Sequence, residues 1–193
     1  APAEQFHYLC PKQKVMTKEF NTTGSCNPAM HYMVDTSKKL AQIEELIDRG
    51  KYFTINRARQ FGKTTTLDSL FRLLSDKYFI IKISFEGLGE DDYREGRLFL
   101  AEFQKILVKR IKTISYDLAD FWKSPVLSFG DLSKKVYDFC KLVNKPVVLM
   151  IDEVDKSQNN QLFLDLLGML RNLYLERSES GDMSSTFHSV ILA

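Results

Sequence analysis

The sequence feature that most constrains the fold is the run PVVLMIDE, residues 146–153. Every residue from Val147 to Ile151 is apolar, whereas a strand with one face in water alternates apolar and polar residues. A strand of this composition is buried on both faces, which requires a layer of helices on each side of its sheet. We therefore predict an α/β fold with a mainly parallel sheet.

Segments of helical and of strand character alternate along the chain. Apolar residues at helical spacing predict helices over residues 35–50, 64–77, 96–114, 115–124, 131–144 and 159–178. Runs of β-branched, aromatic and other apolar residues predict strands over residues 51–56, 78–85, 146–152 and 187–193. Asp131 is expected to cap its helix. The helix over residues 159–178 is apolar nearly all round, so we expect it to lie between two layers.

One boundary divides the chain into two segments. Residues 1–33 mix Pro, Gly, Asn, Thr and Ser without periodicity and are expected to form an extended lead-in. Residues 34–193 form the predicted domain. Its last strand runs to Ala193, so we expect the sheet to be incomplete at the C-terminus, with the chain truncated within its fourth core strand.

The composition excludes several classes of protein. Charged residues make up 27% and hydrophobic residues 44%, which is neither a disordered nor a fibrous composition. A formal net charge of +2 does not favour nucleic-acid binding on charge alone. No apolar run approaches the ~20 residues of a membrane helix, and no signal-peptide pattern opens the chain. Three widely spaced cysteines do not form a disulfide framework, so we expect a cytoplasmic location.

The stretch NRARQFGKTTT, residues 56–66, joins a predicted strand to a predicted helix. It ends like a phosphate-binding loop, although the pattern G-x-x-x-x-G-K-[ST] has glycine where Arg57 stands. In such a loop, backbone amides at the positive end of a helix face phosphate oxygens. Lys63 would then reach the β- and γ-phosphates, the Thr64 hydroxyl would ligate Mg²⁺, and Thr65 would contact the α-phosphate.

The acidic pair Asp152-Glu153 ends the buried strand and matches a Walker B motif. Asp152 is expected to hold the Mg²⁺ bound by Thr64, and Glu153 to orient and deprotonate the attacking water. Taken alone, the pair also fits a helix cap. Both motifs, however, follow strands of one predicted parallel sheet, and ligands bind at the carboxyl ends of such strands. Val147 stands where guanine-specific proteins have an Asp after Asn-Lys-x, so an adenine nucleotide is favoured.

Residues 31–74, HYMVDTSKKLAQIEELIDRGKYFTINRARQFGKTTTLDSLFRLL, resemble the bacterial AAA-ATPase-like family. Members of that family have a Tyr-Val-Asp stretch, a helix, a strand and then Arg-x-Arg-x-Phe-Gly-Lys-[Ser/Thr]. Arg57 is therefore part of the family pattern, whereas Ala58 replaces a proline of many relatives. Asp152 and Glu153 match the Walker B motif of the family, and the resemblance runs from about Lys18 to Ala193.

The resemblance implies a P-loop NTPase three-layer sandwich of the additional-strand class, with strand order 5-1-4-3-2. The strand at the end of this chain would be the fourth, inserted between the two strands that carry the motifs. A sensor residue, a fifth strand, an arginine finger and any C-terminal module would lie beyond Ala193. Many members carry a nuclease-like domain after the ATPase.

These observations together predict an ATP-binding, Mg²⁺-dependent ATPase that uses hydrolysis to drive a conformational or assembly change. Lys63 and Glu153 are the candidate catalytic residues, and Thr64 and Asp152 the candidate metal ligands. The candidate nucleotide-binding residues are Arg59, Gln60, Phe61, Gly62, Lys63, Thr64 and Thr65. Two alternatives stay open: a nucleotide-sensing switch or assembly module with little turnover, and the ATPase part of a nucleic-acid-processing protein, the latter by family analogy alone. Expected partners are ATP and either a homo-oligomer or a C-terminal module.

Three further sets of residues have more than one interpretation. Arg57 and Arg59 either contact phosphate or a partner subunit, or form a solvated loop edge. Zinc accepts ligands of the types found in the set His7, Cys10, Cys26 and His31. These residues therefore either form a zinc site or include isolated cysteines that bind no metal. The aromatic set Tyr116, Phe121 and Trp122 fits either a stacking platform for nucleic acid or ordinary helix packing, and packing is favoured.

Overall fold

The computed structural model describes residues 18–20, 29–32, 34–56, 62–156 and 160–193. The chain divides into two compact units, Ala1–Asp35 and Thr36–Ala193. Within the described part of the first unit, Glu19 and His31 form an isolated parallel bridge. The ring of Phe20 lies 5.0 Å from that of Tyr32. The second unit contains every helix and strand described below.

The second unit is built on four parallel strands in the order β1-β4-β3-β2. Their bounds are Tyr52–Thr54 for β1, Phe79–Ser84 for β2, Val147–Asp152 for β3 and Ser189–Leu192 for β4. β4 is last in the sequence, yet it pairs with both β1 and β3. It therefore lies between the strand that precedes the Gly-Lys-Thr stretch and the strand that ends in Asp152, as the resemblance implies.

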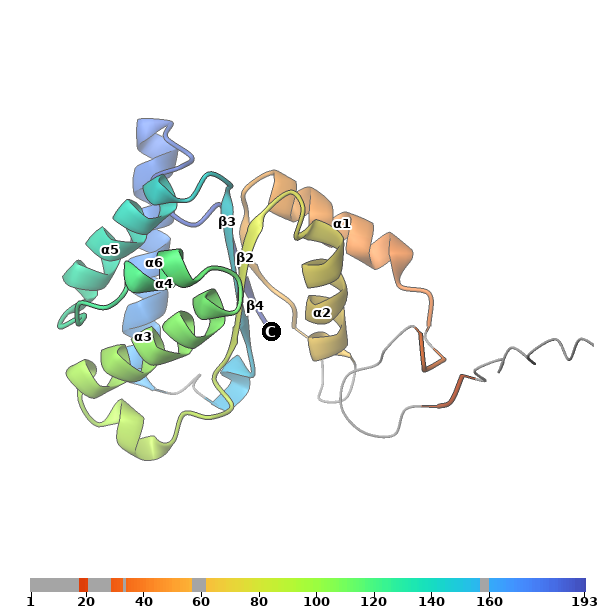
Figure 1. The fold of residues 1–193 in the computed structure, drawn as a ribbon, viewed down its shortest axis with the longest axis horizontal. Coiled ribbons are helices and arrows are strands. Elements are labelled where there is room, and N and C mark those ends of the chain that lie inside the picture. The colour runs from red at the N-terminus through yellow and green to blue at the C-terminus, as the bar shows by residue number, and fades with distance from the viewer. Residues whose placement is uncertain (1–17, 21–28, 33, 57–61, 157–159) are drawn as a thin grey trace, which may run out of the picture. The chain divides into compact units, whose positions relative to one another are not determined.

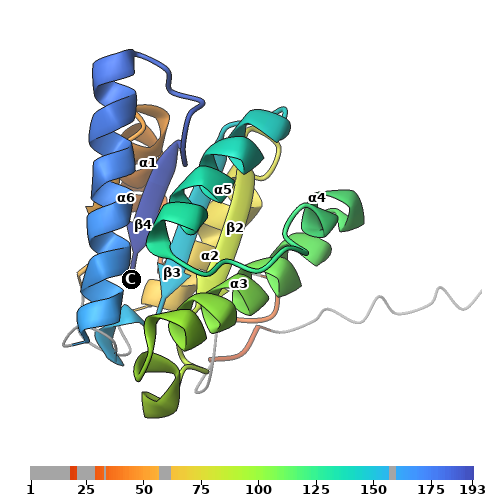
Figure 2. The same ribbon diagram turned by 90° about the vertical axis from the view of Figure 1, so that its left-hand side faces the viewer.

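Helices cover both faces of this sheet, which confirms the predicted three-layer α/β fold. The α-helices are α1 (Ser37–Asp48), α2 (Lys63–Leu74), α3 (Gly96–Lys112), α4 (Tyr116–Asp120), α5 (Phe129–Leu142) and α6 (Gln161–Ser180). The described residues of the unit also form two short 3-10 helices, η1 (Glu90–Tyr93) and η2 (Val154–Lys156). α1 and α2 cover one face, and α3, α5 and α6 cover the other, with α4 beside α3 (Figure 1, Figure 2).

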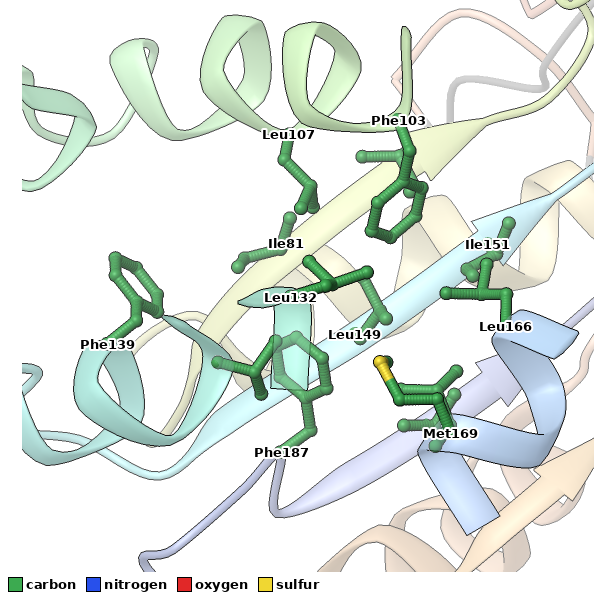
Figure 3. Packing of buried hydrophobic residues seen from close by; sticks show 14 of the residues in the cluster. Ile81, Phe103, Leu107, Leu132, Phe139, Leu149, Ile151, Leu166, Met169 and Phe187 are labelled. Atoms are coloured by element: carbon green, nitrogen blue, oxygen red, sulfur yellow. The ribbon is translucent and has the colours of Figure 1, made fainter. Parts of the chain in front are cut away.

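Successive residues of β3 alternate between two hydrophobic cores. Leu149 and Ile151 belong to the larger core, which β3 forms with α3, α5 and α6 (Figure 3). Val148 and Met150 belong to the smaller core, formed with α1 and α2. All six residues of β3 are buried, as expected for a strand covered on both faces. Full burial of each such side chain contributes roughly 1.5–3 kcal/mol, so β3 stabilises both layers.

Two details of the helices correct the sequence prediction. α5 begins at Phe129 because the Ser128 hydroxyl accepts a hydrogen bond from the Asp131 N–H at 3.1 Å, so Ser128 is the cap and Asp131 is not. The Asp131 carboxylate instead accepts the Leu127 N–H at 3.3 Å. α6 is not enclosed between two layers, since Leu164 and Leu175 on its outer face are 47% and 45% exposed. The helix therefore has more apolar residues than its buried face can hold, and some of them are exposed.

The aromatic set divides between the core and the surface. Trp122 is 1% exposed and its ring lies 5.5 Å from that of Phe139. Phe121 also packs against the larger core, so helix packing is confirmed for both residues. Tyr116 is 77% exposed and does not share this packing. A stacking platform made of all three aromatic rings is therefore wrong.

Buried polar groups join the sheet to the loops at its amino-terminal edge. The guanidinium of Arg177, on α6, donates to the carbonyls of Phe187 at 2.6 Å and His188 at 2.8 Å, and also to the Gly50 carbonyl. It lies over the ring of Tyr52. This network connects α6, the approach to β4 and the turn between α1 and β1. In the part of the chain that the structure describes, no helix is long and apolar enough to cross a membrane.

Candidate functional site

The N-terminus of α2 presents backbone amides that the helix itself does not use. Gly62 is the N-cap and adopts φ 75° and ψ 30°, a left-handed conformation that glycine tolerates without steric cost. The first hydrogen bond of the helix runs from the Thr66 N–H to the Gly62 carbonyl at 2.9 Å. The N–H groups of Lys63, Thr64 and Thr65 precede it and face out of the helix end. Such an end attracts anions, phosphate in particular.

The tip of β3 holds two acidic side chains beside each other. The Asp152 side chain is buried, and the backbone carbonyl of Asp152 accepts the Phe85 N–H at 3.0 Å, which ties the tip to the end of β2. Glu153 follows with φ 58°, an uncommon conformation for a residue with a side chain. The Glu153 N–H also donates to Asp152 Oδ1 at 3.0 Å. The backbone therefore orients the Asp152 carboxylate.

The structure brings the two motifs together. Lys63 Nζ lies 2.6 Å from Asp155 Oδ2, so an ion pair links the start of α2 to η2. Thr64, Asp152 and Glu153 line one cavity of about 380 Å³ between α2 and the ends of β2 and β3. The two residues expected to ligate Mg²⁺ thus border the same space.

Thr64 and Asp152 in this cavity carry groups that suit Mg²⁺, and Lys63 at the start of α2 carries one that suits phosphate. A hydroxyl oxygen and a carboxylate oxygen are hard ligands of the kind that Mg²⁺ prefers. Lys63 is 8% exposed and supplies a positive charge beside the helix amides. Among the described residues no cluster of three or more His, Cys, Asp or Glu side chains forms an alternative metal site.

A model of the AAA-like domain family matches residues 23–191, which include both motifs. The chain belongs to the AAA-like domain family. Membership indicates a nucleotide-binding, ATPase-like character. A search of curated proteins finds no match.

Several predicted site residues of this AAA-like domain lie outside the described residues: Arg57, Arg59, Gln60 and Phe61. Three of the four residues of the zinc set, His7, Cys10 and Cys26, also lie outside them. Cys140, in contrast, is buried in the larger core, and burial raises the pKa of its thiol to about 12. A thiol held neutral in this way behaves as a small apolar side chain.

Other residues of the AAA-like domain line the cavity although the motifs did not indicate them. Lys82 on β2 pairs with Asp68 on α2. Arg110 on α3 places its guanidinium 4.6 Å from the centre of the Phe71 ring. Burial lowers the pKa of Arg110, and the nearby Asp68 carboxylate partly offsets that shift. The sequence contained one signal: Lys82 interrupts the apolar run of β2, and a charge in such a strand needs a partner.

Asp155 is the most informative residue that motif reasoning missed. It lies three residues beyond Asp152, outside the Walker B pattern, and its contact with Lys63 joins segments 92 residues apart in the sequence. A long-range pair of this kind depends on the strand order, which places the N-terminus of α2 next to η2.

Proposed function

We propose that this AAA-like domain binds ATP together with Mg²⁺ and hydrolyses the bond between the β- and γ-phosphates. The observation that supports this most directly is the convergence of Thr64, Asp152 and Glu153 on one cavity at the N-terminus of α2. Amides that face out of a helix end, a buried lysine and two carboxylates are the groups that phosphoryl transfer requires. Membership of an ATPase-like family is consistent with the proposal.

Each residue has a separate role in this proposal. When bound, Mg²⁺ neutralises charge that develops on the phosphate oxygens. The Thr64 hydroxyl and the Asp152 carboxylate hold the metal, while Lys63 and the amides up to Thr65 bind the phosphates. Glu153 accepts a proton from the water that attacks the γ-phosphorus as the bond to the ADP oxygen breaks. Arg59, Gln60 and Phe61 would complete the loop around the phosphates.

The decisive experiment compares nucleotide binding with turnover. Lys63→Ala is expected to weaken the binding of ATP with Mg²⁺ by roughly 100-fold, about 2.7 kcal/mol, in calorimetric titrations. Lys105→Ala, which removes an exposed lysine on α3, serves as the matched control and is expected to leave the dissociation constant unchanged. Glu153→Gln is expected to bind ATP normally but to lose roughly 100-fold or more of the hydrolysis rate. Unaltered ATP binding by Lys63→Ala would contradict the proposal.

A nucleotide-sensing switch with little turnover is the second candidate function. The ion pair between Lys63 and Asp155 favours it. Lys63 would have to leave Asp155 when it binds phosphate, so ATP binding itself would change the contact between α2 and η2. The same experiment separates the two functions. If ATP binds through Lys63 while neither the wild-type chain nor Glu153→Gln hydrolyses it measurably, the switch explains the site and the hydrolase does not.

Three finer assignments remain predictions of the sequence and of its family resemblance. They are the additional-strand class of the fold, the bacterial origin and the cytoplasmic location. Homo-oligomer formation and a C-terminal module are proposals of the same kind. The sheet edge at β1 is where the resemblance would place a fifth strand.

A further inference from the structure

The ion pair between Lys63 and Asp155 has properties that a surface ion pair lacks. The contact between Nζ and Oδ2 measures 2.6 Å, within hydrogen-bonding distance. The Lys63 side chain is only 9% exposed and that of Asp155 is 36% exposed. Because water is largely excluded from the lysine, the attraction between the two charges is screened less than in an exposed pair.

The backbone around Asp155 is anchored, and this holds the Asp155 carboxylate close to Lys63. Asp155 lies in η2, directly after the tip of β3. The preceding residue, Val154, is buried in the larger core, and its N–H donates to the Ala193 carbonyl at 3.2 Å. The short aspartate side chain extends from this anchored backbone, so the carboxylate has little freedom to move away.

Phosphate and the Asp155 carboxylate compete for the same ammonium group. Under the function proposed above, Lys63 must donate to the phosphates of ATP. If Asp155 stays in contact, its negative charge lies next to the negative phosphates and repels them. If Lys63 leaves Asp155, the free energy of the ion pair is lost. Either outcome weakens ATP binding relative to a site without this carboxylate.

We propose that Asp155 is a latch: it holds the Lys63 ammonium in the nucleotide-free site and lowers the affinity of the domain for ATP. This inference rests on the proposed function and deepens it, because it names the residue that sets the nucleotide concentration at which the site fills. Asp155 is a positioning residue that acts through Lys63, not a ligand of the nucleotide.

The test is Asp155→Asn in the 193-residue chain, which removes the charge but keeps the shape of the side chain. We expect the dissociation constant for ATP with excess Mg²⁺ to fall about tenfold in calorimetric titrations, equivalent to about 1.4 kcal/mol. The matched control is Asp182→Asn, which makes the same change of charge in the ion pair with Lys141. The control should bind ATP as the wild type does. Equal or weaker ATP binding by Asp155→Asn would overturn the latch, and weaker binding would make Asp155 part of the metal or phosphate site.

A second measurement separates the latch from a general loss of structure. Without nucleotide, Asp155→Asn should unfold at a lower temperature than the wild type, because the pair with Lys63 is weakened. With saturating ATP and Mg²⁺ its melting temperature should rise more than that of the wild type. An equal or smaller rise contradicts the latch. If Asp155→Asn does not fold, Asp155→Ser provides the same comparison without a side chain that reaches Lys63.

The outcomes also distinguish this inference from the proposed function. If the wild-type chain binds ATP in a manner that requires Lys63, but Asp155→Asn gains no affinity, only the latch is wrong. If neither chain binds ATP, the proposed function itself is wrong.

Discussion

Glu153 has a strained backbone conformation and also occupies a position in the candidate site. A left-handed backbone costs roughly 1–2 kcal/mol for a residue with a side chain. Glu153 adopts it at φ 58°, directly after Asp152, whose carboxylate accepts the Glu153 N–H. The sequence indicated Glu153 as a candidate catalytic residue from its place after Asp152. The backbone conformation that places it could not be predicted, because it depends on contacts of the β3 tip with β2 and β4.

Gly50 provides a test at the residue scale. It has φ +64°, and a Cβ atom built on it would lie 2.8 Å from Met183 Cε and 3.2 Å from the His188 carbonyl oxygen. We expect Gly50→Ala to lower the free energy of unfolding by about 1–3 kcal/mol through backbone strain and crowding. Urea denaturation would measure the change.

The matched control for Gly50→Ala is Gly168→Ala. Gly168 lies in the interior of α6, and nothing would lie within 4 Å of an added Cβ. Alanine there should stabilise the chain by about 0.5–1 kcal/mol, because it has the higher helix propensity. Equal effects of the two substitutions would show that the left-handed turn at Gly50 is not what requires glycine.

At the scale of elements, α6 shows that composition alone does not reveal which helix face is buried. Its sequence is apolar nearly all round, yet Leu164 and Leu175 face outward. The one charged residue on its buried face, Arg177, is 1% exposed and donates to three carbonyls from two other segments. A helical pattern predicts the helix but does not identify partners that lie far away in the sequence.

Arg177→Met tests this element. Methionine fills most of the space but leaves the carbonyls of Gly50 and His188 without the arginine donor, whereas the Phe187 carbonyl keeps its hydrogen bond from Tyr52. Each buried polar group left unpaired costs about 1–3 kcal/mol, so we expect a loss of roughly 2–6 kcal/mol in the free energy of unfolding. Arg171→Met, on the exposed face of the same helix, should change it by less than about 0.5 kcal/mol. Thermal or urea unfolding of both variants would decide.

At the scale of the whole molecule, the sheet order decides what the motifs can do together. β4 enters between β1 and β3, so the N-terminus of α2 and the tip of β3 both lie at the carboxyl ends of the strands. The Arg177 network and His188 lie at the opposite, amino-terminal ends of the strands. The carboxyl ends are proposed to bind nucleotide, and the groups at the amino-terminal ends contribute to stability.

His188 gives that stability a dependence on pH. Its ring stacks on Tyr78 at 5.4 Å, and burial, assisted by the charge of Arg177, lowers its pKa from 6.5, although Asp48 and the carbonyls of Ile47 and Asp48 oppose the shift. The folded state therefore binds fewer protons than the unfolded state between the lowered pKa and about pH 6.5. The contribution of His188 is complete above that pH and is lost as the pH falls through the lowered pKa.

We accordingly expect the free energy of unfolding to decrease as the pH is lowered from about 7 to about 5. His188→Phe keeps an aromatic ring against Tyr78 and removes the titrating group, so the decrease should be smaller in this variant. Urea denaturation at several pH values would measure both slopes. Identical slopes for the two proteins would mean that His188 does not contribute.

The sequence by itself determined the fold class and the two motifs. The unbroken apolar run of β3 can be satisfied only by burial on both faces, and Gly62 to Thr64 and Asp152 to Glu153 are local patterns whose chemistry follows from residue types. Only the tertiary structure decided the pairs that cross the chain: Lys63 with Asp155, Lys82 with Asp68, and Arg177 with the carbonyls before β4. Local propensity specifies strands and helices, but partners far apart in the sequence are chosen by strand order and packing, which depend on the whole chain.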